Sequence, residues 1–423
     1  MKNTFALATL GAALALLSGH ANAQERAPEL DDGQLKPGET VADRRQDEYK
    51  SDGIRMGSFI ANPSLMVRGA YDDNIFFQTN NTTDDLVTTI SPAVNVTSNW
   101  ENHLVKIDTG MDIIRYADST AENAEDYWFT PSARIDVSRQ TQINLSLDLR
   151  HGHEGRGDAN AVNGDSPTET DTGAFSAEVE HRPGRFFLIG SAEYKNRSFD
   201  NVNTSTGVPI NNQDRDRDEQ IVSATLGYEI QPGYNAFVRG TASDFDYDSA
   251  VDDNGFNRDS SGVTAELGVE LDLSGTVNGE IALGATNRDY DDARFDDTNS
   301  WSTRSQLFWQ MSPLTTFVFN ASRSISESTE LNASGFLSTS FGVAMAHELR
   351  RNVVLEANVF VTENDFEGIA RTDDLFGGTL SATWDINRNF HAGASYEYSE
   401  RESDVAAVEY ERNLFMIWAG YRL

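Results

Sequence analysis

Apolar and polar residues alternate along most of this chain. From Val263 to Leu273 every second residue is apolar, and the intervening residues are Thr, Glu, Gly or Asp. Residues 143–150 and 222–230 show the same pattern. Because successive side chains of a β-strand point to opposite sides, these segments are predicted to be strands with one apolar and one polar face.

The C-terminal segment, Leu414 to Leu423, follows the same rule. Phe415, Ile417, Tyr421 and Leu423 fall on one face, so we expect the chain to end inside a strand. A final strand of this kind, with an aromatic residue near the carboxylate, is typical of the strand that closes an outer-membrane β-barrel.

The connections distinguish a membrane barrel from a soluble β-sandwich, because outer-membrane barrels alternate tight periplasmic turns with long outer loops. The short turns are predicted at about 99–102, 138–141, 182–185, 231–234, 274–276, 312–315, 350–352 and 387–389. Nine longer polar connections separate them, the longest at roughly 152–172 and 198–218. The sequence therefore predicts an all-β, antiparallel, up-and-down barrel of about 18 strands (range 16–18), wide enough for an aqueous channel.

The N-terminus has the features of a secretory signal peptide. Lys2 provides a positive charge, Phe5 to Leu17 form a mostly apolar run, and Ala21-Asn22-Ala23 is a cleavage site of the A-x-A type. We therefore expect residues 1–23 to be removed, 24–56 to form a flexible periplasmic extension, and 57–423 to form the barrel. No later apolar run reaches the roughly 20 residues of a membrane-spanning helix.

Charge and composition narrow the range of partners. The chain has 33 basic and 67 acidic residues and a net charge of −34, which disfavours nucleic acid and anionic lipid surfaces as partners. It contains no cysteine, which excludes cysteine-based catalysis.

Orienting the apolar face toward lipid places many charged residues of both signs on the lumen side. Such rows can contact hydrated or sugar-like solutes; alternatively, they form ion pairs that stiffen the wall. The candidate lumen-lining residues are Arg68, Lys106, Asp108, Asp112, Arg134, Asp148, Arg150, Glu193, Arg239, Glu266, Glu270, Glu280, Arg304, Glu356 and Glu397.

No constellation of catalytic residues is found. His151 and His153 share one strand face beside Glu154, a spacing that can hold a metal, but we interpret them as rim residues that continue the lipid-facing row. His391 is predicted to point into the lumen near the periplasmic rim, without any nucleophile motif beside it. We expect no enzyme activity, cofactor or metal.

Several short motifs resemble a known family. Residues 53–59, 63–65 and 71–76 (Tyr71-Asp72-Asp73-Asn74-Ile75-Phe76), with Asn99-Trp100 and Arg115-Tyr116-Ala117, are similar to the opening of the putative β-barrel porin 2 family. That family is associated with capsular and exopolysaccharide gene clusters. The resemblance implies an outer-membrane barrel that takes part in polysaccharide export.

We therefore expect an outer-membrane channel whose partners are membrane lipid, a polysaccharide and periplasmic export machinery. The acidic balance opposes an anionic polymer unless arginines contact it locally. Two alternatives stay open: a general or solute-specific diffusion porin with one long loop folded inward, and a non-conducting structural barrel. The sequence does not determine the oligomeric state.

Overall fold

The computed structural model describes residues 38–44, 49–273 and 275–423, and the chain forms a closed antiparallel β-barrel of 18 strands. This confirms the predicted fold class. The first half of the wall consists of β2 (Phe59–Asp72), β3 (Asp85–Ser98), β4 (Leu104–Tyr116), β5 (Ala124–Ser138), β6 (Thr141–His153), β7 (Glu169–His181), β8 (Phe186–Phe199), β11 (Arg217–Gln231) and β12 (Tyr234–Tyr247). The second half consists of β13 (Ser260–Leu273), β14 (Val277–Tyr290), β15 (Thr298–Ser312), β16 (Thr315–Glu327), β17 (Gly335–Arg350), β18 (Val353–Phe366), β19 (Thr372–Asp385), β20 (Phe390–Ser403) and β21 (Tyr410–Arg422).

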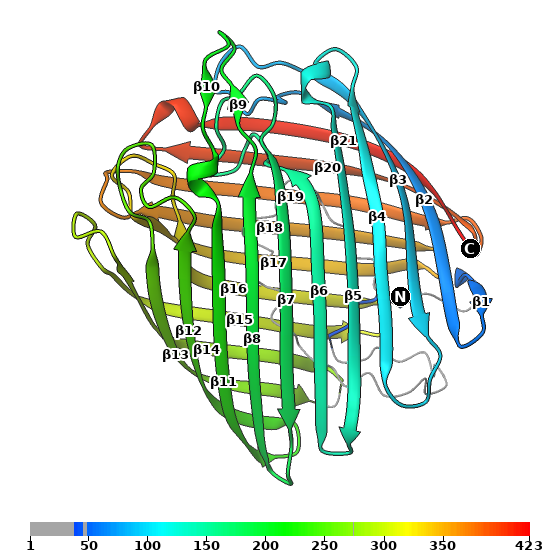
Figure 1. The fold of residues 1–423 in the computed structure, drawn as a ribbon. Helices are drawn as coiled ribbons and strands as arrows, with labels where there is room; N and C mark the ends of the chain where they lie inside the picture. Colours follow the sequence, from blue (N-terminus) through cyan, green and yellow to red (C-terminus); the bar gives the residue numbers. More distant parts are fainter. Residues whose placement is uncertain (1–37, 45–48, 274) are drawn as a thin grey trace.

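Each strand pairs with its neighbours in sequence, and all short turns lie at one end of the barrel (Figure 1). The eight predicted turns and nine longer connections are all present between these strands. The two longest loops are shorter than predicted, spanning 154–168 and 200–216, because β6 and β8 extend further and β7 and β11 begin earlier. The longer loops also contain the 3-10 helices η3 (Thr120–Glu122), η4 (Gln213–Arg215) and η5 (Ala406–Val408) and the small hairpin of β9 (Val202–Asn203) and β10 (Pro209–Ile210).

The barrel closes where its first and last strands meet. β2 pairs with β21 from Ser64–Arg422 to Asp72–Leu414. At the outer end of this seam, Arg412 donates to both carboxylate oxygens of Asp72 at 2.6–3.0 Å, with both side chains almost fully buried. The Tyr-Asp-Asp-Asn motif therefore contributes directly to closure, since Asp73 also accepts hydrogen bonds from the backbone and side chain of Asn413.

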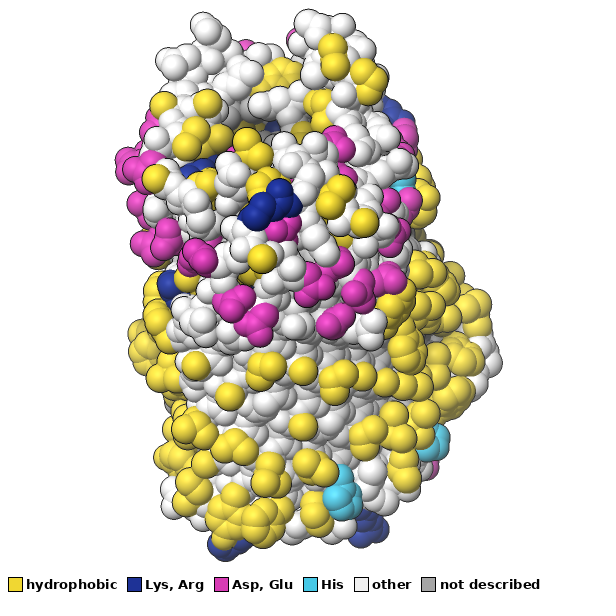
Figure 2. Space-filling model, turned by 60° about the vertical axis from the view of Figure 1, so that its left-hand side comes forward, with side chains coloured by type: hydrophobic (Ala, Val, Ile, Leu, Met, Phe, Trp, Pro, Cys, Tyr) yellow, Lys and Arg dark blue, Asp and Glu magenta, His cyan; other side chains and the backbone are white. Residues whose placement is uncertain are grey.

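The two faces of the strands differ as the alternation predicts. Leu267 is 68% exposed whereas the adjacent Glu266 is only 5% exposed. On the face that Figure 2 shows, hydrophobic side chains are concentrated in the lower half and acidic side chains gather above them, toward the long loops. The exposed apolar face matches the lipid-facing surface of an outer-membrane barrel.

The described part of the N-terminal extension is in contact with the barrel. β1 (Ile54–Met56) forms a hairpin with the start of β2, so the predicted barrel boundary at residue 57 falls within this hairpin turn. The predicted signal peptide and residues 24–37 lie outside the described residues. Among the described residues, no helix has the length and apolar character needed to cross a membrane.

Inward-facing aromatic rings lie against glycines on the neighbouring strand. The directly opposed pairs are Trp128–Gly110, Phe187–Gly227, Phe237–Gly268, Phe360–Gly377, His391–Gly420 and Trp418–Gly393. At each of these glycines, an added Cβ would approach the ring to within 2.6 Å. The absence of a side chain on one strand thus allows the ring to lie flat against the inner wall.

We predict that Gly227→Ala destabilises the barrel by about 1–3 kcal/mol, because the methyl group would overlap the Phe187 ring. Gly190→Ala is the matched control, since a Cβ there meets no atom within 4 Å. Denaturant unfolding of both variants from lipid vesicles measures the difference. Equal stabilities would contradict this account of the glycine.

Candidate functional site in the barrel lumen

The predicted lumen residues lie on the strand face opposite the exposed apolar rows, and many of them bond one another across strands. Arg239 forms ion pairs with Glu266 at 3.3 Å and Glu280 at 2.7 Å. Arg68 pairs with Asp112 at 3.1 Å and also donates to Ser91. These residues therefore form ion pairs within the wall, which is the alternative predicted from the sequence for the charged rows.

The other candidates vary in their contacts. The hydrogen bonds and ion pairs are Asp108 with Trp128, Arg134 with Asp136, Arg150 with Asp148, Glu270 with Asn235, and Glu397 with Arg412. Lys106, Glu193, Arg304 and Glu356 occupy the same strand face by alternation. A role for the set in lining a conducting path stays a prediction.

The opposite part of the wall, formed by β16–β18, presents mainly neutral polar groups to the lumen. Asn320 accepts a hydrogen bond from Gln306 at 2.9 Å, and Thr362 donates to Ser340 at 2.9 Å. Charged groups on β4–β8 and β11–β14 thus face hydroxyl and amide groups across the barrel. Sequence alternation assigns these small polar residues to the lumen, but only the ring order of the strands places them opposite the charges.

The loop between β6 and β7, residues 154–168, reaches across the outer mouth. β6 and β16 are separated by seven intervening strands in the ring, almost half of its circumference. Nevertheless, Asn160 in this loop donates to the Glu327 carbonyl at the end of β16 at 3.0 Å and accepts from the Thr329 amide at 3.1 Å. The alternative with one long loop folded inward therefore has a structural counterpart.

Further contacts hold this loop in place around the mouth. Arg156 forms a two-bond ion pair with Glu122 at 2.6 and 2.9 Å. Ala159 packs against the cluster of Ala333, Phe336 and Phe366 on the far side. The crossing loop is thus bound at both sides of the barrel.

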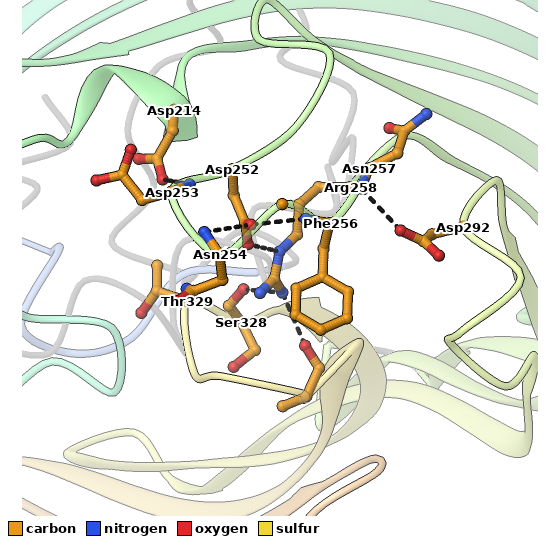
Figure 3. A network of polar contacts seen from close by, with 12 residues as sticks. Asp214, Asp252, Asp253, Asn254, Phe256, Asn257, Arg258, Asp292, Ser328 and Thr329 are labelled. Carbon is orange, nitrogen blue, oxygen red and sulfur yellow. Dashed lines mark hydrogen bonds and ion pairs between the residues drawn. The ribbon is translucent and has the colours of Figure 1, made fainter.

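Arg258 joins three outer loops, one of which is its own. Its guanidinium bonds Asp252 at 2.9 Å and the carbonyls of Ser328 and Ala333 at 2.8 and 2.7 Å (Figure 3). It also stacks on Phe295 at 5.2 Å from the ring centroid and is only 4% exposed. A single buried cation therefore links loops 248–259, 291–297 and 328–334. Sequence reasoning did not identify Arg258, because an arginine in an acidic loop gives no distinctive local signal.

The N-terminal segment 38–44 covers part of the lumen wall near the short turns. Val41 is fully buried and packs on Ala346 of β17. Arg44 donates to Glu348 at 2.9 Å and to the Pro313 carbonyl at 2.8 Å, and the Gly38 amide donates to Asn278 at 2.8 Å. Both ends of the lumen are therefore narrowed by segments of the same chain.

The histidines bond individual side chains of the wall. His151 contacts Asp171 at 2.9 Å and stacks on Tyr127, while His153 contacts Asp126 at 2.8 Å. His391 lies flat against Gly420 and is buried. No group of three potential metal ligands occurs in the described parts of the chain.

Docking of the crossing loop should depend on pH through Asp158. Burial, aided by the nearby Glu154 carboxylate, raises the pKa of Asp158 from 3.8 to about 6, against the opposing effects of a Gly155 hydrogen bond, Arg401 and His153. A raised acid pKa favours docking in full below pH 3.8, and this contribution is lost as pH rises through about 6.

We therefore predict that single-channel conductance is lower at about pH 5 than at about pH 7.5, and that Asp158→Asn removes most of this difference. Asp165→Asn is the control, because Asp165 is an exposed carboxylate in the same loop. An unchanged pH response in Asp158→Asn would show that another group controls the loop.

We predict that Val41→Asp releases segment 38–44, because an unpaired carboxylate at a fully buried position costs several kcal/mol. Trypsin should then cleave after Arg44 at least about tenfold faster. Asp43→Asn changes an exposed neighbour and serves as the control. Equal cleavage rates in both variants would mean that Val41 does not anchor the segment.

Comparisons with known proteins identify the family. In the crystal structures of OccK2 (OpdF) from Pseudomonas aeruginosa and a BenF-like porin from Pseudomonas fluorescens Pf-5, the aligned chains are 10% and 13% identical to this chain, with TM-scores of 0.46 and 0.44. Both alignments cover 86% of this chain and 98% of the other. A search of curated protein sequences finds no match. The model of the family described as putative beta-barrel porin 2 matches residues 47–421, and the chain therefore belongs to this family of porin-like outer-membrane barrels.

Proposed function

We propose that this barrel is a non-enzymatic channel that conducts carbohydrate across the outer membrane as part of capsular or exopolysaccharide export. The observation that carries the proposal is the polar inner wall, in which paired charges on one side face hydroxyl and amide groups on the other. These groups can exchange hydrogen bonds with a hydrated sugar chain as it moves. The family resemblance supports the assignment to polysaccharide export.

The segments at the two ends of the lumen suggest a gated path. Loop 154–168 would have to release the Asn160 contacts for a polymer to leave at the outer mouth. Segment 38–44 would have to leave Ala346 and Glu348 at the other end. Periplasmic export machinery that binds the N-terminal extension would supply the energy for the second step.

A solute-specific diffusion porin is the second candidate function. The inward position of loop 154–168 favours it, because such a loop narrows a permanently open pore to the size of a small solute. In that case the loop keeps its place while solutes pass, whereas export of a polymer requires it to move. The two functions therefore differ in what happens when the loop is fixed.

A reversible cross-link can make this distinction. The chain has no cysteine, so Asn160→Cys combined with Thr329→Cys introduces a single thiol pair at a site where the two residues are in hydrogen-bond contact. With the disulfide formed, we predict that the strain no longer secretes polysaccharide, and that a reductant restores secretion. The two single-cysteine variants are the controls.

Conductance and secretion should be measured on the same variants. Large conductance of the reduced protein in planar bilayers, blocked by oligosaccharides, together with loss of secretion in a deletion strain, supports the export channel. Normal secretion with the disulfide fully formed would contradict loop movement and favour the diffusion porin. Absence of conductance in both redox states, from a demonstrably folded barrel, would leave a gated exporter that needs its periplasmic partner if secretion depends on the gene, and a structural barrel if it does not.

A further inference from the structure

One row of inward-facing residues crosses the inner wall from β5 to β12 and contains three arginines. Cross-strand pairing places its members side by side in the order Trp128, Arg150, Thr172, Arg197, Arg217 and Tyr247. Arg197 and Arg217 are directly opposed on adjacent strands. Like charges in this position repel each other, so the arrangement costs stability unless anions offset it.

Glu219 supplies part of this compensation within the wall. It lies 2.9 Å from Arg217, 3.0 Å from Arg197 and 3.9 Å from Lys195, so three cations share one carboxylate. Glu193 lies on the same face of β8, two residues from Lys195. Arg150 has its own partner, Asp148, at 2.8 Å.

The charged residues of the row itself are nevertheless all cationic, although the neighbouring Asp148 side chain is 29% exposed. The Arg150 and Arg197 side chains are 56% and 36% exposed, whereas that of Glu219 is 8% exposed. Both arginines form these ion pairs through Nε, and their exposed fractions leave part of each side chain accessible to a solute in the lumen. Two strand spacings separate them, about 10 Å between backbones.

An aromatic surface lies beside these arginines. Trp128 adjoins Arg150 in the row, and its ring is held flat over Gly110 while its Nε1–H donates to Asp108 at 2.7 Å. An indole held in this way presents a rigid apolar face that can pack against the flat side of a sugar ring. The Thr172 hydroxyl, between the two exposed arginines, adds a neutral hydrogen-bonding group.

We propose that this row is a binding site for acidic carbohydrate, in which Trp128 stacks on a sugar ring and Arg150 and Arg197 bind its carboxylate, sulfate or phosphate groups. Guanidinium groups suit such anions because they can donate two parallel hydrogen bonds. The inference rests on the proposed function and specifies the substrate class. The net charge of −34 repels an anionic polymer. The arginines of the row would attract such a polymer locally inside the lumen.

The direction of the row suits a polymer in transit. Strands of such barrels tilt by about 35–45°, so a row at right angles to them climbs along the barrel axis as it crosses the wall. The arginines therefore lie at successive heights in the lumen. An acidic chain can be passed from one to the next without a single tight site that would hold it.

Calorimetry on the detergent-solubilised full-length barrel tests the proposal, with an oligogalacturonate and a maltooligosaccharide of equal length as probes. We expect the acidic probe to bind at least about tenfold more tightly at low salt, and this preference to disappear near 1 M salt, where screening extends to about 3 Å. The double variant Arg150→Gln/Arg197→Gln should lose about tenfold in affinity for the acidic probe alone.

Arg139→Gln/Arg388→Gln is the matched control, because it also removes two positive charges, both from exposed positions in periplasmic turns. Equal affinity for the two probes, or an equal loss of affinity for the acidic probe in Arg139→Gln/Arg388→Gln, would overturn the proposal. Trp128→Leu should weaken the binding of both probes. If the binding of neither probe is weakened, the indole does not stack on the sugar. Calorimetry needs no conduction, so an absence of channel current would count against the proposed function and not against this site.

Discussion

The requirement that every backbone hydrogen-bonding group in lipid be satisfied dictates the rest of this structure. A sheet in a membrane cannot keep open edges, so β2 and β21, which lie at opposite ends of the sequence, have to pair. The buried Asp72–Arg412 ion pair fixes the outer end of that seam. Once the seam is formed, the strand number sets the width of the lumen, and strand alternation decides which side chains enter it.

Within the closed wall, two kinds of packing give the lumen its surface. Glycines opposite aromatic residues let rings such as Phe187 and Trp418 lie flat instead of projecting into the pore. Ion pairs such as Arg239–Glu280 keep long charged side chains close to the wall. Both arrangements keep large side chains along the wall, while a more exposed side chain such as Arg150 remains available to a solute.

At each end of the barrel, a segment of the same chain obstructs the lumen. At the outer mouth the obstruction is polar and depends on hydrogen bonds at Asn160 and on the buried guanidinium of Arg258. At the other end it depends on one apolar side chain, Val41, and the Arg44–Glu348 ion pair. The outer obstruction includes Asp158, a carboxyl whose pKa is raised to about 6. The inner obstruction, segment 38–44, is itself part of the N-terminal extension. The two ends can therefore respond to different signals.

The sequence by itself determined the strands, their order, the turns and the face on which each side chain lies. These properties depend on a period of two and on local turn chemistry, which are readable between near neighbours such as Glu266 and Leu267. Only the tertiary structure decided which residues meet across the lumen. Asn160 and Thr329, or Val41 and Ala346, are brought together by the circumference of the closed ring and by loops that fold into it. The inner row of arginines depends on both the sequence and the tertiary structure. Sequence alternation places each arginine on the inner face, and the register of β6, β7, β8 and β11 aligns them in one row.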